Sequence, residues 1–300
     1  MSAIGRIVVI GHAALDSVYR IEAFPRTPTK VRALEHIEAG GGMAANAAAT
    51  IGRLGGAVEL WSRVGDDEAG RRIRELLAAD GVDTRYVKVF PGRRSSTSAV
   101  IVDGGGERLV VGERDHAMSM DAGWLPLERL AAARAVVSDG RWLEATRIAF
   151  ERARLENVPT LLDADPGGGG DLEGQIALAD YAILSAAALD ALVGPGEVGP
   201  RLDAVLALGP RHAGVTRGAA GYTWRSRSGG GHQQAIAIEV VDTTGAGDAF
   251  HGAFAWALAA GHPEAECARI AATVAALKCR RLGARAGLPT ARELAAVLAT

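Results

Sequence analysis

Two acidic residues, two threonines and two glycines lie within seven positions, in the segment DTTGAGD from Asp242 to Asp248. The apolar run that follows has helical spacing, so the segment is predicted to be a tight turn that opens into a buried helix. Gly245, Ala246 and Gly247 have almost no side chain, and a phosphate could therefore approach the backbone N–H groups at the helix N-terminus. Asp248 would repel a phosphate, but it could take a proton from an attacking hydroxyl group as a general base.

This segment resembles the C-terminal signature of the ribokinase-like, or PfkB, family of sugar kinases. In that family the loop forms the anion hole for the transferred phosphoryl group, and its last Asp, here Asp248, is the catalytic base. A simpler reading is a helix start capped by Asp242 or Thr243, with glycines that allow close packing. A match over the whole loop is more specific than a pair of glycines and favours the kinase. The resemblance implies ATP and Mg²⁺ as cofactors.

The composition limits the class of protein. The chain has 300 residues, 48% of them hydrophobic, which is enough for a sizeable core in one large α/β unit or in two domains. A formal net charge of −2 predicts no general attraction to nucleic acid or to an anionic membrane, so the expected partners are small molecules. Cys267 and Cys279 lack the spacing of a CxxC metal pair and are expected to be reduced packing residues. No apolar run is long enough for a signal peptide or a membrane span, and we expect a cytoplasmic protein.

Short buried strands alternate with helices along most of the chain. The run RIVVIGH at residues 6–12 predicts a fully buried first strand, and YAILS and HAGVTRG repeat the pattern further on. The alternation predicts an α/β fold, a three-layer doubly wound and mostly parallel sheet. The resemblance implies a single ribokinase-like domain of residues 1–300. Two alternating blocks, at about 17–39 and 85–115, interrupt it. The resemblance implies that they form a small β-sheet lid over the sugar, and we expect a homodimer through this lid.

Two segments in the first half of the chain are predicted to hold the sugar. Asp16 follows the first strand at its carboxyl end, where ligands bind in open α/β sheets, although a turn or helix-cap Asp would look the same. Gly41 and Gly42 precede a predicted helix and let a ligand lie against the backbone, and Asn46 can both donate to and accept from vicinal hydroxyls. Both segments resemble sugar-binding motifs of the family, although Met43 stands where many ribokinases have Lys.

The nucleotide contacts are implied by the resemblance. The turn with Thr216, Gly218 and Gly221 matches the family's TxGxxG turn, which contacts the phosphates and ribose of ATP. An ordinary hairpin turn would have the same spacing. Gly283 matches the late loop in which the family binds adenine.

Two metal sites are also implied. The family places a monovalent cation, K⁺ in this prediction, near Asp242 and Thr244, although Gly287 replaces a Ser that many members have. In segment 185–188, Ser and Ala replace an Asn and a Glu that organise water around Mg²⁺ in many relatives. Mg²⁺ is therefore expected to depend on the ATP phosphates, on water, and on Asp163 or Asp165.

Within the family the nearest resemblance is to the sulfofructose kinases, which phosphorylate an acidic ketose. It rests on the fragments Gly40-Gly-Gly, AVIVDGGGER, SDGRW, VVDTTGAGDAFHGA and AALKCRRLGARAGLP. Lys30, Arg114 and Arg141 could converge on a sulfonate or phosphate, because an Arg fork suits tetrahedral anions, although each alone would be an ordinary surface charge. Gly112 replaces an amide of those kinases, so a neutral ketohexose, a keto-deoxy sugar acid and a sugar phosphate stay open.

The leading hypothesis is an ATP-dependent sugar kinase that phosphorylates a primary hydroxyl. A ribokinase or a nucleoside kinase of the same fold is an alternative, although the lid offers few aromatic residues to stack on a base. A catalytically silent binding protein is another, prompted by Ser185 and Ala188. The intact Asp248 and its glycines argue against it.

Overall fold

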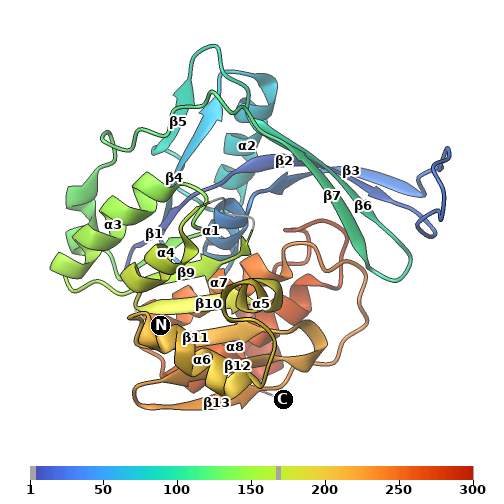
Figure 1. Cartoon of the computed structure of the whole chain (residues 1–300). Coiled ribbons are helices and arrows are strands. Elements are labelled where there is room, and N and C mark those ends of the chain that lie inside the picture. Colours follow the sequence, from blue (N-terminus) through green and yellow to red (C-terminus); the bar gives the residue numbers. More distant parts are fainter. Residues whose placement is uncertain (1–4, 167–169, 300) are drawn as a thin grey trace.

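The computed structural model describes residues 5–166 and 170–299, which form one large sheet between two layers of helices and a small second sheet (Figure 1). The strands of the large sheet are β1 (Ile7–Ile10), β4 (Val58–Gly65), β5 (Val87–Phe90), β8 (Ala135–Ser138), β9 (Thr160–Ala164), β10 (Tyr181–Ser185), β11 (His212–Thr216), β12 (Tyr222–Ser226) and β13 (Gly229–Gln233). Their order is β13-β12-β11-β10-β9-β8-β1-β4-β5. All neighbours are parallel except β11–β12 and β12–β13. The predicted doubly wound α/β fold is confirmed.

Helices cover both faces of the large sheet, and each layer has its own core. One layer contains α1 (Met43–Arg53), α2 (Glu68–Ala79), α7 (Ala246–Ala259), α8 (Glu264–Lys278) and α9 (Ala291–Leu298). The other contains α3 (Leu143–Leu155), α4 (Leu172–Leu178), α5 (Ala186–Val193) and α6 (Val198–Ala207), with the 3₁₀ helix η1 (Leu127–Ala132). In β1, Ile7 and Val9 belong to the first core and Val8 and Ile10 to the second. Side chains of a strand alternate between faces, so this strand has to be apolar throughout.

The small sheet has the order β3-β2-β6-β7 and projects from the edge of the domain (Figure 1). Its strands are β2 (Ala14–Arg20), β3 (Glu35–Gly41), β6 (Ser96–Val102) and β7 (Arg108–Glu113). One of its faces buries Val18, Val100 and Val102 against Leu282 of the main domain. The outermost strand, β7, is exposed at every residue. The separate small sheet predicted from the two alternating blocks is therefore present.

The sequence analysis places one strand in the wrong sheet. Residues 87–90, part of the predicted lid block 85–115, form β5, which pairs in parallel with β4 of the large sheet, Ser62 opposite Val87. Val87 is buried in the same core as Leu77 of α2. The alternation of VKVF shows only that the strand is half-buried, which an edge strand of either sheet would satisfy. The lid block thus begins after this strand.

None of the helices in the described residues is long and apolar enough to cross a bilayer.

Candidate active site

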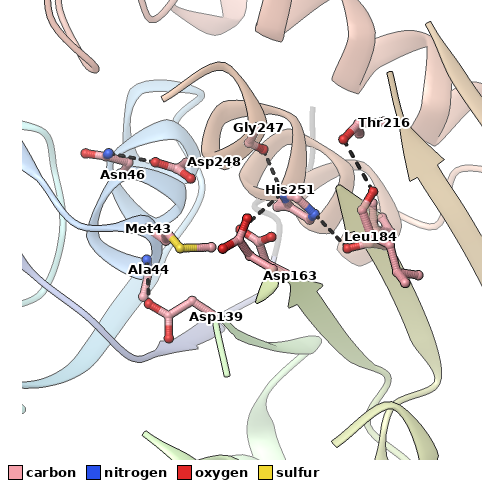
Figure 2. A network of polar contacts seen from close by, with 12 residues as sticks. Met43, Ala44, Asn46, Asp139, Asp163, Leu184, Thr216, Gly247, Asp248 and His251 are labelled. Atoms are coloured by element: carbon pink, nitrogen blue, oxygen red, sulfur yellow. Dashed lines mark hydrogen bonds and ion pairs between the residues drawn. The ribbon is translucent and has the colours of Figure 1, made fainter. Parts of the chain in front are cut away.

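Two helices of the same layer bring the predicted base and a predicted sugar ligand together. Asp248 lies in the first turn of α7 and Asn46 in the first turn of α1, and the Asn46 Nδ2 donates a 2.8 Å hydrogen bond to Asp248 Oδ2 (Figure 2). The helices approach closely because Gly252 lies between them, where a Cβ would come within 2.5 Å of the Ala47 carbonyl oxygen. Small residues along both helices thus fix this pair of side chains.

The loop before α7 leaves the helix N-terminus open. Gly245 occupies the cap position with φ 75°, and no side chain caps the helix. A Cβ at Gly247 would meet no atom within 4 Å, so open space adjoins the first turn. The N–H groups of this turn have no intrahelical partners and bear the positive end of the helix dipole. This arrangement suits an anion, and Asp248 lies beside it.

The loop is held from behind by Asp242 and a buried Lys. The Asp242 Oδ1 accepts from the Thr244 N–H at 2.8 Å, and its Oδ2 accepts from the Gly283 N–H at 2.7 Å. The fully buried Lys278 Nζ donates to the Asp242 carbonyl at 2.7 Å. These contacts join the anion loop to the loop after α8, which contains Gly283. Sequence analysis missed Lys278, because a Lys near the end of a helix is usually exposed.

The surroundings of Asp248 suit a general base near neutral pH. Burial raises the pKa of the Asp248 carboxyl to about 6, and the charges of Asp139 and Asp16 act in the same direction. The Asn46 hydrogen bond and the charge of Arg108 lower this pKa and so prevent a larger rise. A base is most effective when its pKa is near the working pH.

We expect kcat/KM of the kinase reaction to fall as the pH falls through about 6, the pKa of Asp248. Only the ionised carboxylate accepts a proton, so the rate should drop about tenfold for each pH unit below the midpoint. Steady-state assays from pH 4.5 to 8, with ATP saturating and the sugar below KM, measure this limb. A kcat/KM that stays level down to pH 4.5 would contradict this role for Asp248, whose raised pKa places its midpoint near 6.

Asp16 lies on the sugar side of the same region. It is buried in β2, and it packs so closely on Gly41 that a Cβ there would lie 2.2 Å from Asp16 Oδ2. Burial raises the pKa of Asp16, while a hydrogen bond from Ser98 and the charge of Arg285 lower it. Gly42, with φ 87°, is the cap residue of α1. The residues Asp16, Gly41, Gly42 and Asn46, predicted from two separate motifs, therefore meet where β2, β3 and α1 adjoin.

Asp139 is a site residue that the sequence analysis did not select. It follows β8, and its Oδ2 accepts from the backbone N–H group of His12 at 2.8 Å. The same oxygen accepts from the Ala44 N–H at 3.1 Å (Figure 2). Its Oδ1 accepts from the Arg141 N–H at 3.0 Å. The sequence could have indicated Asp139 in the way it indicated Asp16, because both are carboxylates that follow a buried strand at its carboxyl end. Asp139 fixes the backbone around the predicted sugar site.

Of the three predicted anion-binding residues, Arg114 and Arg141 both lie within electrostatic range of His12. The Arg141 Nε lies 3.0 Å from Met43 Sδ, and its Nη2 lies 3.5 Å from Asp165 Oδ1. Arg114 is exposed after β7, and its charge is felt at His12, whose pKa burial lowers. Lys30 is exposed between β2 and β3.

The predicted Mg²⁺ residues lie at the end of β9. The Asp163 Oδ2 is 3.3 Å from the Nδ1 of His251, which also lies 2.7 Å from the Gly247 carbonyl (Figure 2). Burial lowers the pKa of His251 to about 4, and burial together with the charge of Asp248 raises the pKa of Asp163. His251 thus links β9 to the first turn of α7. No group of three or more His, Cys, Asp or Glu within residues 5–166 and 170–299 could hold a metal ion.

The predicted nucleotide residues form the turn after β11. Thr216 ends that strand, Gly218 is the first residue of the 3₁₀ helix η3 (Gly218–Ala220), and Gly221 caps η3 before the antiparallel strand β12. The turn is therefore a hairpin connection, as the simpler reading proposed.

The whole described chain matches one family and several of its members. Residues 5–291 match the pfkB family carbohydrate kinase. The chain is 30% identical to the ribokinase of Bacillus subtilis (strain 168), across 97% of this chain and 99% of that protein. It is also 30% identical to a fructokinase of Klebsiella pneumoniae, across 97% and 98%. A crystal structure of a provisionally named ribokinase from Agrobacterium tumefaciens has a TM-score of 0.93 at 36% identity, covering 98% of this chain and 97% of that one.

A fold and a site of this kind define a sugar kinase. The chain belongs to the pfkB family of carbohydrate kinases, and it is an ATP-dependent carbohydrate kinase. The family prediction made from the DTTGAGD loop is confirmed.

Proposed function

We propose that this kinase transfers the γ-phosphoryl group of ATP to a primary hydroxyl of a ketose or related sugar. The observation that carries the proposal is the position of Asp248, a half-buried carboxyl with a pKa raised to about 6, beside the uncapped N-terminus of α7. Asp248 takes the proton of the attacking hydroxyl, and the N–H groups from Gly245 to Asp248 stabilise the charge on the transferring phosphoryl group. Asp16, Asn46 and the backbone at Gly41 and Gly42 hold the sugar.

The named relatives support this reaction class. They include two fructokinases, several ribokinases and an ATP-dependent ribose-1-phosphate kinase of Halopiger xanaduensis, 29% identical to this chain. The Arabidopsis thaliana ribokinase, 26% identical with a TM-score of 0.83, was solved with ribose and ATP. We infer that Thr216, Gly218, Gly221 and Gly283 contact the nucleotide in this chain.

We also propose one site for Mg²⁺ and one for K⁺. Mg²⁺ would neutralise the triphosphate, with Asp163 or Asp165 as its protein ligands; a nearby cation would favour the ionised form of these carboxyls. The buried Thr244 Oγ1 has no hydrogen-bond partner in the described chain, which fits a K⁺ ligand. Asp242 fits less well, because both of its carboxylate oxygens accept from N–H groups and Lys278 already supplies a cation at its carbonyl.

We also propose a cytoplasmic homodimer that pairs through the lid. The edge strand β7 exposes half or more of Leu109, Val110 and Val111, and an uncovered apolar edge strand favours pairing with another strand. A mass in solution that equals the monomer at micromolar concentration would contradict this pairing.

An acidic ketose such as 6-deoxy-6-sulfofructose is the substrate that we favour within this class. Arg141 supports it, since its guanidinium lies beside Met43 at the start of α1, close to the predicted sugar ligands. A neutral ketohexose, ribose, a keto-deoxy sugar acid, a sugar phosphate and a nucleoside are the alternatives. ATP consumption measured with one member of each class tests the proposal. Phosphorylation of none of them would contradict a sugar kinase activity.

Arg141→Ala should raise KM for an acidic ketose about tenfold or more while changing KM for a neutral ketose little, because only the acidic ketose loses a charge-assisted hydrogen bond. Arg147→Ala is the matched control, since Arg147 forms an exposed ion pair with Glu151 on α3. Equal effects of Arg141→Ala on both substrates would contradict the anionic-sugar proposal.

A further inference from the structure

Arg285 is a buried arginine that the proposed reaction does not yet use. It lies in the loop between α8 and α9, with 8% of its surface exposed. Its Nε donates to Asn46 Oδ1 at 2.8 Å, and its Nη2 donates to the Gly41 carbonyl at 3.2 Å. Its Nη1 lies 3.5 Å from Asp80 Oδ2, at the end of α2. One guanidinium therefore contacts two residues of the predicted sugar site.

The side chain is held tightly in this position. A Cβ at Gly40 would lie 2.3 Å from the Arg285 guanidinium, so β3 passes directly against it. A planar guanidinium with donors in a fixed fork keeps its orientation once two of its N–H groups are bonded. Burying an arginine is costly unless its donors are paired, and here Nε and Nη2 both donate hydrogen bonds.

The two neighbours of Asn46 determine how its amide points. A guanidinium can only donate hydrogen bonds, so the amide atom that faces Arg285 has to be the oxygen. An ionised carboxylate can only accept, so the amide nitrogen has to face Asp248, and its 2.8 Å bond to Oδ2 agrees. Without Arg285 the amide could rotate, and its oxygen would then face the carboxylate of the base.

We propose that Arg285 is a positioning residue for catalysis: by donating to Asn46 Oδ1 it orients the amide so that Nδ2 donates to the ionised carboxylate of Asp248. The inference rests on the proposed role of Asp248 as the base. Arg285 itself touches neither the base nor the transferring group.

The charged residues around Arg285 and Asp248 also affect whether the Asp248 carboxyl is ionised. Asp16 on β2, Asp80 at the end of α2 and Asp248 on α7 all lie within electrostatic range of the Arg285 guanidinium. Asp139 and Asp16 disfavour the ionised form of Asp248, whereas Arg108 on β7 favours it. Without the hydrogen bond from the oriented Asn46 amide, the negative charges of Asp139 and Asp16 would raise the pKa of Asp248 further.

Arg285→Met tests the proposal, because Met fills the space but neither donates nor carries a charge. We expect kcat to fall about tenfold to a hundredfold and the acidic limb of kcat/KM to move up by about one pH unit. Arg285→Lys keeps a donor and should return the limb to its wild-type position. Arg72→Met is the matched control, since Arg72 forms an exposed ion pair with Glu38.

A double-variant cycle shows whether Arg285 acts through Asn46. Once Asn46→Ala has removed the amide, Arg285→Met should lower kcat little further. Additive losses, or a wild-type acidic limb in Arg285→Met, would overturn the proposal and indicate a purely structural arginine.

Nuclear magnetic resonance of the wild-type chain tests the inference even if a variant does not fold or if the chain phosphorylates none of the sugars. The ¹⁵N resonance of Arg285 Nε should shift with the same pH midpoint as the ¹³C carboxyl resonance of Asp248. No response at Arg285 would overturn the inference, while failure of every sugar alone would contradict only the proposed function.

Discussion

Asp248→Asn is expected to lower kcat by about 10²-fold to 10⁴-fold, the usual contribution of a general base. Asn has the shape of Asp and its Oδ1 can still accept the hydrogen bond from Asn46, so the helices and the sugar site should keep their arrangement. An amide cannot take the proton of the attacking hydroxyl at neutral pH. The expected result is therefore a loss in kcat with KM for the sugar and the thermal midpoint nearly unchanged.

Asp171→Asn provides the control for this substitution. Asp171 caps α4 by accepting the Gly174 N–H at 2.8 Å, and Asn caps helices as well as Asp does. Steady-state kinetics of both variants at pH 7.5 make the comparison. A kcat for Asp248→Asn within tenfold of that of Asp171→Asn would contradict the role of Asp248 as the base.

Much of the fold is predictable because it depends on local patterns. The apolar runs of β1 and β10 indicate strands buried on both faces, and helices between such strands require parallel crossovers. The sheet to which β5 belongs was not predictable in this way. Its four residues carry only a period-two pattern, and its partner is determined by packing against α2, which no short segment encodes.

The candidate site also contains residues that the sequence predicts and residues that only the structure reveals. Asp248 and the residues before it were found because their loop, helix start and small side chains are adjacent in sequence. Arg285 and Asn46 are separated by 239 positions, and nothing local distinguishes Arg285 from the other arginines of its segment. Lys278 was missed because it acts through a tertiary contact with the backbone of the anion loop. His251 was missed because its long-range partners, Asp163 and the Ile183 carbonyl, are distant in sequence. Residues that bind a ligand tend to lie in motifs, while residues that position them do not have to.

The position of Gly245 determines where the N–H groups of α7 point. Its φ of 75° lies in the left-handed region, and a Cβ would come within 2.8 Å of the Ala284 Cβ. An Ala at this position has to change its dihedral angles or push away the loop that contains Gly283. Either movement shifts the donors that face the phosphoryl group.

Gly245→Ala should therefore lower kcat by about 10²-fold, the usual loss when one such donor is misplaced. It should also lower the free energy of unfolding by about 1–2 kcal/mol, because Ala tolerates a left-handed conformation poorly.

Gly261→Ala separates these two effects. Gly261 follows the other end of α7 with φ 83°, and a Cβ there would meet no atom within 4 Å. Its Ala variant should lose about 1–2 kcal/mol of stability from the backbone alone, with unchanged kcat. Chemical denaturation and steady-state kinetics of the two variants make the comparison. If both variants lose stability equally and both keep wild-type kcat, the N-terminus of α7 does not hold the transferring phosphoryl group.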